Sequence, residues 1–129
     1  MALYHLHNDT ISRGKGQSVV AAAAYRARER LRDETTGQVK DCTRKTEQPV
    51  LFSGIYAPKN APQRTREQLW NAAERAEDEH NRKSWRVAIT AQDMDMALME
   101  ELTLEQNRRL LQDFIREQFT RHGYAVTAD

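Results

Sequence analysis

The chain has 129 residues, of which 39% are apolar and 30% charged, and its formal net charge is +1. This length predicts a single domain, residues 1–129, large enough for a hydrophobic core. No apolar run is long enough to span a membrane, and the N-terminus lacks the pattern of a signal peptide, so we expect a cytoplasmic protein. The single cysteine, Cys42, excludes an intramolecular disulfide.

The first predicted element is a strand over Leu3–Thr10. His5 and His7 share one face of it, because alternate residues of a strand point the same way. Two histidines on one face can share a metal ion, but they hold it weakly unless a third ligand such as Asp9 joins them. The commoner alternative is that both histidines are hydrogen-bonded parts of the framework.

A glycine-rich basic loop, Gly14–Gln17, precedes a helix predicted over Ser18–Arg32, with Ser18 as its N-cap. The free N–H groups and positive dipole end of such a helix suit a phosphate. Tyr25 lies two turns inside the helix, after four alanines that allow another backbone or a nucleic-acid strand to come close. This arrangement suits a tyrosine that attacks a phosphodiester, and the alternative is ordinary packing of a helix of small residues.

Positive charge is concentrated in the N-terminal third of the chain. Residues 1–45 contain nine Lys and Arg against five Asp and Glu, a balance of +4, so the remainder must sum to −3. A basic segment around a glycine loop is where phosphate contacts are expected. However, Arg26, Arg28, Arg30 and Arg32 recur every second residue, which spreads them around a helix, and a merely solvated basic helix is an equally common outcome.

The remaining elements alternate between strand and helix. In chain order we predict a polar loop over 33–45 that turns at Thr36–Gly37, a strand over 50–56, a helix over 65–80 and a strand over 85–90. A third helix then starts at a capping box of Thr103 and Gln106 and ends at Gly123, and a last strand follows over 124–127. The buried stripe of the third helix is Leu104, Leu111, Ile115 and Phe119, widened by Phe114. The pattern favours an α+β fold, a mainly antiparallel sheet with helices packed on one face.

Several segments together resemble the MobA/MobL family of plasmid mobilisation relaxases, in the same order and with similar spacing over nearly the whole chain. They are Met1–Leu6, Ile11–Ser18, Ala21–Arg26, Asp33–Gly37, Pro58–Pro62, Leu69–Glu74 and Leu104–Asn107. The resemblance implies a relaxase-like fold and an enzyme that cuts one DNA strand at a transfer origin. It also implies a tyrosine nucleophile on a helix, beside a divalent metal (Mn or Mg) bound by histidines. By motif position Tyr25 is that nucleophile.

The chain departs from the family pattern at the metal site. The family's histidine cluster follows a strand that resembles Tyr124–Asp129, and none of the four histidines of this chain stands in such a motif. The metal's ligands are therefore not present in this chain, and its relaxase-like fold is expected to be incomplete. Many relatives also carry an acidic residue near the position of Arg86. Without this motif we expect strand nicking by Tyr25 to be impaired, and the sequence leaves open whether the chain is an active enzyme.

The predicted mechanism is attack by Tyr25 on single-stranded DNA, giving a 5′-phosphotyrosine link and a free 3′-hydroxyl. A phenol, with a pKa of about 10, needs a base or nearby positive charge for this attack. Arg26 and Lys15 are placed to supply charge, while Arg13, Lys15 and Arg28 hold the DNA backbone. The predicted DNA-binding residues are Arg13, Lys15, Arg26 and Arg28.

Three functional hypotheses remain open at the level of the sequence. The first is a relaxase domain that is active when joined to the histidine segment. The second is a DNA-binding competitor that keeps the fold without cutting. The third is an interaction protein of a mobile element, such as an inhibitor of a host defence complex, that reuses a relaxase-derived scaffold. The C-terminal strand, as an exposed edge, is the predicted contact for a protein partner.

Overall fold

The computed structural model describes residues 6–44, 50–80 and 89–129. Its elements are β1 (Leu6–Ser12), the 3₁₀ turn η1 (Arg13–Lys15), α1 (Val19–Ala27), β2 (Arg30–Arg32), β3 (Val39–Asp41), β4 (Gly54–Tyr56), α2 (Arg66–His80), β5 (Ile89–Met96), α3 (Leu104–Gln118), the 3₁₀ turn η3 (Thr120–His122) and β6 (Val126–Ala128). The predictions for His5 and Arg86, and residues 85–88 of the strand predicted over 85–90, lie outside the described residues. No helix in the described ranges has the length and apolar character needed to cross a membrane.

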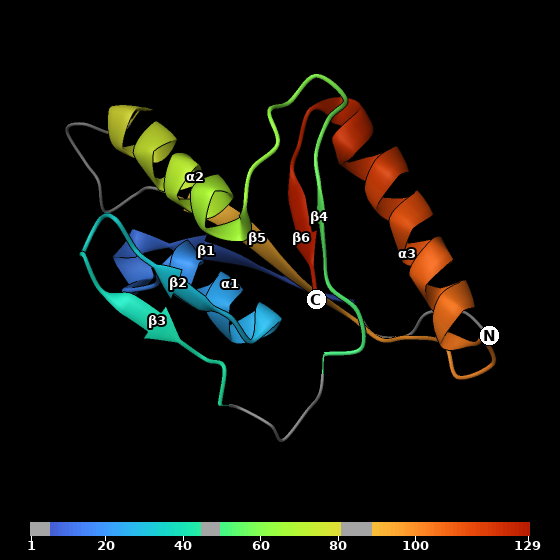
Figure 1. Cartoon of the computed structure of the whole chain (residues 1–129). Helices are drawn as coiled ribbons and strands as arrows, with labels where there is room; N and C mark the ends of the chain where they lie inside the picture. Colours follow the sequence, from blue (N-terminus) through green and yellow to red (C-terminus); the bar gives the residue numbers. More distant parts are fainter. Residues whose placement is uncertain (1–5, 45–49, 81–88) are drawn as a thin grey trace.

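The described strands form three antiparallel pairs, β1 with β5, β2 with β3, and β4 with β6 (Figure 1). The predicted α+β class with antiparallel strands is therefore confirmed. The longest pair is β1–β5, in which His7 lies opposite Asp95 and Asp9 lies opposite Asp93. These two pairs of residues project from the same face, because side chains directly opposite each other in an antiparallel pair point to the same side.

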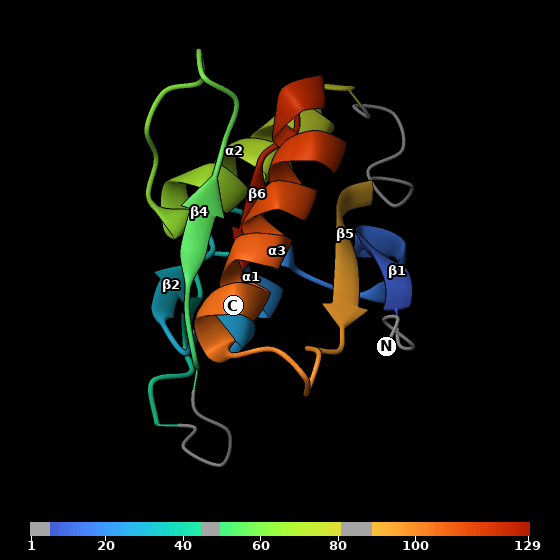
Figure 2. The ribbon, with the colours of Figure 1, turned by 90° about the vertical axis from the view of Figure 1, so that its right-hand side faces the viewer.

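The helices flank the strands on two sides. α1 and α2 contact each other, and both lie on the opposite side of β4 and β6 from α3 (Figures 1 and 2). The hydrophobic core gathers around α1 and is formed by Ile11, Val19, Val20, Ala23, Ala24 and Leu31. Two of the four consecutive alanines, Ala23 and Ala24, are thus buried in the core, so this part of the helix serves packing.

The first helix is shorter than predicted. It ends at Ala27, because Arg28 adopts the left-handed conformation (φ +57°) and its N–H caps the helix on the Ala24 carbonyl. The chain then enters β2, where Leu31 is buried in the core, and not a continued helix up to Arg32. The β2–β3 hairpin turns at Gly37 (φ +74°) within the loop predicted over 33–45.

Asn71 of α2 fastens this hairpin to the helix. Its side chain is 1% exposed, its Oδ1 accepts from the Glu34 N–H at 2.9 Å, and its Nδ2 donates to the Arg32 carbonyl at 2.8 Å. Both polar ends of a buried amide are thereby satisfied. The hairpin is consequently held against α2.

Other boundaries also differ from the prediction. The strand predicted over 50–56 is shortened to Gly54–Tyr56, and the last strand is Val126–Ala128. The capping box of Thr103 and Gln106 is confirmed, but α3 ends at Gln118, and Gly123 instead ends the 3₁₀ turn that follows. In the predicted stripe Ile115 is buried, whereas Leu104 in the first turn is 44% exposed.

Candidate functional site around Tyr25

The N-terminus of α1, where the sequence suggested a phosphate, is occupied by side chains of the protein. Ser18 Oγ accepts from the Ala21 N–H at 3.2 Å and donates to Asp33 Oδ2 at 2.7 Å. Asp33 is 3% exposed, and its Oδ1 also accepts from the Thr35 N–H at 3.0 Å. The Asp33 carboxylate thus supplies the negative charge that a helix N-terminus favours. A phosphate arriving here would meet a carboxylate.

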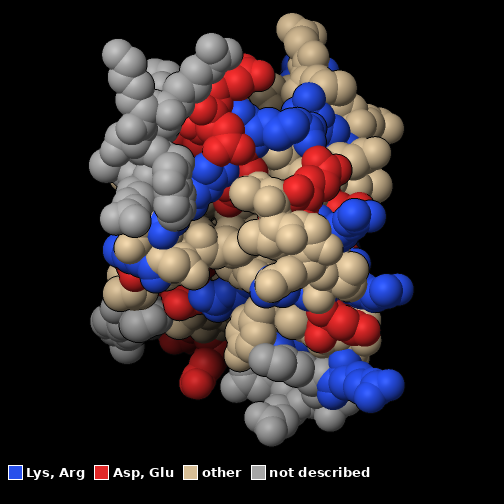
Figure 3. All heavy atoms as spheres, turned by 90° about the vertical axis from the view of Figure 1, so that its left-hand side faces the viewer, with Lys and Arg blue, Asp and Glu red and all other residues tan. Residues whose placement is uncertain are grey.

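The surface outside this helix end is an open hollow with charges of both signs. It is lined from α2 by Glu74 and Asp78, from the loop before α1 by Arg13, and from β3 by Lys40. On the face viewed from the left of Figure 1, Lys and Arg side chains are interspersed with Asp and Glu (Figure 3). The basic excess of the N-terminal third therefore does not appear here as one basic patch.

Arg13 is bound to α2. Its Nε donates to Glu74 Oε2 at 2.8 Å, its Nη2 donates to the Glu74 carbonyl at 3.2 Å, and its Nη1 pairs with Asp78. The Arg13 and Glu74 side chains are 10% and 4% exposed. The hydrogen bond to Asp78, with support from Glu74, raises the pKa of Arg13 above its ordinary value despite partial burial. Its guanidinium is therefore already engaged by carboxylates.

Lys15 is more accessible. Its Nζ contacts Asp9 Oδ1 at 3.2 Å and Thr10 Oγ1 at 3.2 Å, and the Lys15 side chain is 49% exposed. The Thr10 N–H and then Lys15 lower the pKa of Asp9, so the carboxylate stays charged beside the ammonium. An exposed pair of this kind is weak and easily exchanged for another anion.

Tyr25 lies in the last turn of α1 and is 45% exposed. The guanidinium carbon of Arg28 lies 4.9 Å from the centroid of its ring, and Arg28 Nη1 donates to the Tyr25 carbonyl at 3.2 Å. The left-handed backbone of Arg28 accompanies this return of the side chain onto the preceding turn. A cation thus stacks on the phenol ring that the sequence singled out.

Arg26 ties α1 to β5. Its Nη2 donates to Asp93 Oδ2 at 2.7 Å and its Nη1 donates to Asp95 Oδ1 at 3.0 Å. Partial burial acts to lower the pKa of Arg26, but the hydrogen bonds and charges of Asp93 and Asp95 outweigh it, so the pKa is raised. The two arginines that follow Tyr25 closely in the chain, Arg26 and Arg28, therefore both have defined partners.

The donors near Arg26 do not form a metal site. His7, Asp9, Asp93 and Asp95 project from the same face of the β1–β5 pair, and Arg26 engages the last two. Among residues 6–44, 50–80 and 89–129, no group of three or more His, Cys, Asp or Glu side chains is arranged to hold a metal ion. The described donors thus do not fit the divalent metal that the resemblance implies. The Arg26 guanidinium supplies the positive charge that faces Asp93 and Asp95.

The sequence did not identify the carboxylates that organise this site. Asp93 and Asp95 alternate along β5, but the strand was predicted over 85–90 and so ended before them. Glu74 and Asp78 lie one turn apart on α2, a spacing that reveals a shared helix face but not its partner. Each contact joins residues more than 60 positions apart in the chain.

The chain is similar to known proteins over nearly its full length. The model of the MobA/MobL family matches residues 17–129. Mobilization protein MobL of Acidithiobacillus ferridurans is 38% identical over 98% of this chain and 31% of its own length. Probable mobilization protein MobA of Bifidobacterium longum is 34% identical over 98% of this chain and 21% of its own length. Conjugal transfer protein TraA of Agrobacterium fabrum is 32% identical over 100% of this chain and 12% of its own length.

One solved structure also shares the fold. It comes from work on the molecular basis of vancomycin resistance transfer in Staphylococcus aureus, and it superposes with a TM-score of 0.82 at 26% identity. The match covers 98% of this chain and 61% of that chain. The chain thus spans less than a third of each of the three relatives named above. Because the family model covers most of its residues, the chain belongs to the MobA/MobL family.

Proposed function

We propose that the chain is a relaxase-type domain that binds single-stranded DNA at a transfer origin, with Tyr25 as the nucleophile. The relatives' names, mobilization and conjugal transfer proteins, support the class of process. The observation that carries the assignment of Tyr25 is its place on α1, where the residue is half-exposed and Arg28 stacks on its ring, while Arg26, the next residue in the chain, is bound to β5. A nucleophile needs both access and a fixed orientation.

In the proposed step, the Tyr25 phenol oxygen forms a bond to phosphorus and the bond from phosphorus to the 3′-oxygen breaks. The phenol proton leaves to solvent or a base, and the 3′-oxygen gains a proton. The product is a 5′-phosphotyrosine link, which attack by the 3′-hydroxyl reverses. Arg28 adds positive charge beside the phenol as it loses its proton. The described metal-ligating side chains do not fit a divalent metal, so this step is assigned to the chain's own side chains.

The four predicted DNA-binding cations differ in how strongly other side chains already hold them in the free chain. Lys15 is held by an exposed pair with Asp9 and an exposed hydrogen bond to Thr10, and of the four it is the most readily available for a phosphate. Arg13 and Arg26 would have to exchange carboxylate partners for phosphate. Arg28 would have to keep its stack on Tyr25 while contacting the strand. We therefore propose Lys15 as the principal phosphate contact.

The role of Tyr25 predicts covalent attachment of DNA to the chain. Purified chain, with and without Mn²⁺, is incubated with labelled single-stranded DNA from the transfer origin of its own element and run on a denaturing gel. We expect a protein–DNA band that Tyr25→Phe abolishes. Tyr124→Phe is the matched control and should keep the band, because Tyr124 is 64% exposed but lies beyond α3. Attachment that persists in Tyr25→Phe would contradict the assignment.

A second candidate function is a DNA-binding competitor that does not cut. It is favoured by one observation, the lack of a fitting metal group among the described residues. A native-gel shift without a covalent band would support it. No shift at all would favour a protein-binding role instead, and β6, paired with β4 on one edge, is then the proposed contact.

A further inference from the structure

Arg66, the first residue of α2, is 5% exposed. An arginine is almost never buried this deeply unless it is paired, because removing its charge from water is costly. Its environment therefore calls for a separate explanation.

The Arg66 guanidinium joins three segments that are distant in the sequence. Its Nη1 donates to Glu29 Oε1 at 2.9 Å, just after α1, and its Nη2 donates to Asp129 Oδ1 at 2.5 Å, just after β6. Nη2 also contacts Ser53 Oγ at 2.9 Å, just before β4. Ser53 in turn donates to the same Asp129 carboxylate. One side chain thus links the segments after α1, before β4 and after β6.

The two carboxylates are not equivalent. The Asp129 side chain is 2% exposed, whereas that of Glu29 is 43% exposed. A charge pair acts much more strongly in the interior than at the surface, and breaking a buried pair leaves an uncompensated charge. The contact of Arg66 with Asp129 is therefore the stronger of the two. The contact of Arg66 with Glu29 links the guanidinium to the helix that carries Tyr25. The Glu29 N–H bonds the Ala24 carbonyl at 3.1 Å, so Glu29 is closely tied to that helix.

An arginine is required for this geometry. Each Nη group serves a different carboxylate, and Nε donates to no acceptor among the described residues. The compact ammonium of lysine cannot span both carboxylates as the planar guanidinium does. The residue therefore acts as a bridge.

We infer that Arg66 is a positioning residue that fixes the end of β6 relative to the Tyr25 helix. A role of Arg66 in the reaction of Tyr25 with DNA rests on the proposed function, but the link that Arg66 makes between β6 and α1 does not. A displacement at Asp129 is passed through Arg66 and Glu29 to the last turn of α1. Arg66 touches no substrate and acts only through these partners.

The first test needs no DNA. Asp129→Asn is introduced into the unaltered chain and into Arg66→Met, and the backbone amide resonances of Tyr25 and Glu29 are compared by NMR. We expect shifts in the unaltered background and their loss in Arg66→Met. Arg64→Met, a change at an exposed arginine two residues away, should leave the shifts intact. Equal shifts in both backgrounds would overturn the inference.

A second variant separates positioning from stability and serves if Arg66→Met alone does not fold. Arg66→Met with Asp129→Leu replaces the buried pair by apolar side chains, which often restores stability. We expect near-normal unfolding and unchanged DNA affinity, but attachment slower by roughly 10- to 100-fold, since a small misplacement costs that much. Attachment at the normal rate in this variant would overturn the inference. If the unaltered chain attaches no DNA, the proposed function fails, and the amide shifts still decide the role of Arg66.

Discussion

Arg28 combines an unfavourable backbone with a specific side-chain contact. Its φ of +57° is in the left-handed region, which costs a residue other than glycine roughly 1–2 kcal/mol. A guanidinium stacked on an aromatic ring at a partly exposed site returns about 0.5–1 kcal/mol. The contact with Tyr25 therefore only partly offsets the backbone cost. Such local strain is a feature of functional sites.

Arg28→Gly and Arg28→Ala form a matched pair that isolates the backbone cost, because both lack the guanidinium. Only glycine adopts the left-handed conformation without strain, so we expect Arg28→Gly to exceed Arg28→Ala in free energy of unfolding by about 1 kcal/mol. Urea denaturation of the two variants measures this difference. An alanine variant at least as stable as the glycine variant would show that Arg28 is not strained in solution.

At the scale of elements, the sequence predicted the features that depend on local signals. The capping box at Thr103 and the helix over 65–80 follow from neighbouring residues and are confirmed. The end of α1 was missed because its cap is an arginine and not the glycine that normally marks a helix end. β2 was read as helix because arginine and leucine are good helix formers, and Leu31 becomes a strand residue only through burial against α1. Tyr25 was found through its motif, whereas its surrounding ion pairs required the tertiary fold.

Because Arg26 of α1 is paired with two carboxylates of β5, removing those carboxylates should increase DNA binding. Asp93→Asn with Asp95→Asn removes the two carboxylates that occupy Arg26 and so frees one cation beside Tyr25. We expect tighter binding of single-stranded DNA and a plot of log affinity against log salt that steepens by about 0.7, the value of one added phosphate contact. Fluorescence anisotropy over a salt series measures both.

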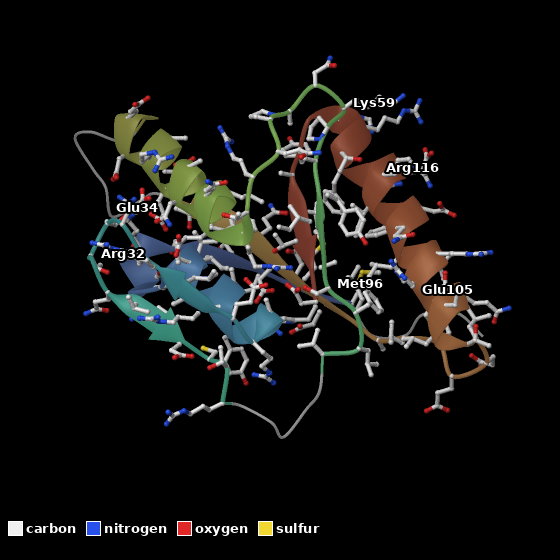
Figure 4. The ribbon with its side chains drawn as sticks, in the orientation of Figure 1. Arg32, Glu34, Lys59, Met96, Glu105 and Arg116 are labelled. Carbon is white, nitrogen blue, oxygen red and sulfur yellow. The ribbon has the colours of Figure 1, made fainter. Side chains whose placement is uncertain are left out.

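The control for this gain is Asp113→Asn with Glu117→Gln. These changes remove the same number of negative charges from the outer part of α3, where Asp113 and Glu117 pair with Arg116 and Arg121. Figure 4 places Arg116 on the opposite side of the molecule from Arg32 and Glu34 of the hairpin. An equal gain in the control would mean that net charge, and not the release of Arg26, changes the affinity.

For the whole molecule, folding offsets part of the charge asymmetry of the sequence. The N-terminal third carries the excess of Lys and Arg, but Arg13 pairs with Glu74 and Asp78, and Arg26 pairs with Asp93 and Asp95, all from the later part of the chain. The mixed colours of Figure 3 reflect this. The proposed DNA binding would therefore involve a few accessible cations, because the face seen in Figure 3 carries no broad basic surface.

The salt dependence of binding follows from this distribution. With two or three phosphate contacts, log affinity for single-stranded DNA should fall against log salt with a slope of about −1.4 to −2.1. Lys15→Gln should reduce the magnitude of that slope by about 0.7, because Lys15 is an accessible cation just before α1. Lys59→Gln, in the loop between β4 and α2, should leave the slope unchanged. A slope steeper than about −4 would require more phosphate contacts than these cations provide, and would place the DNA on a different surface.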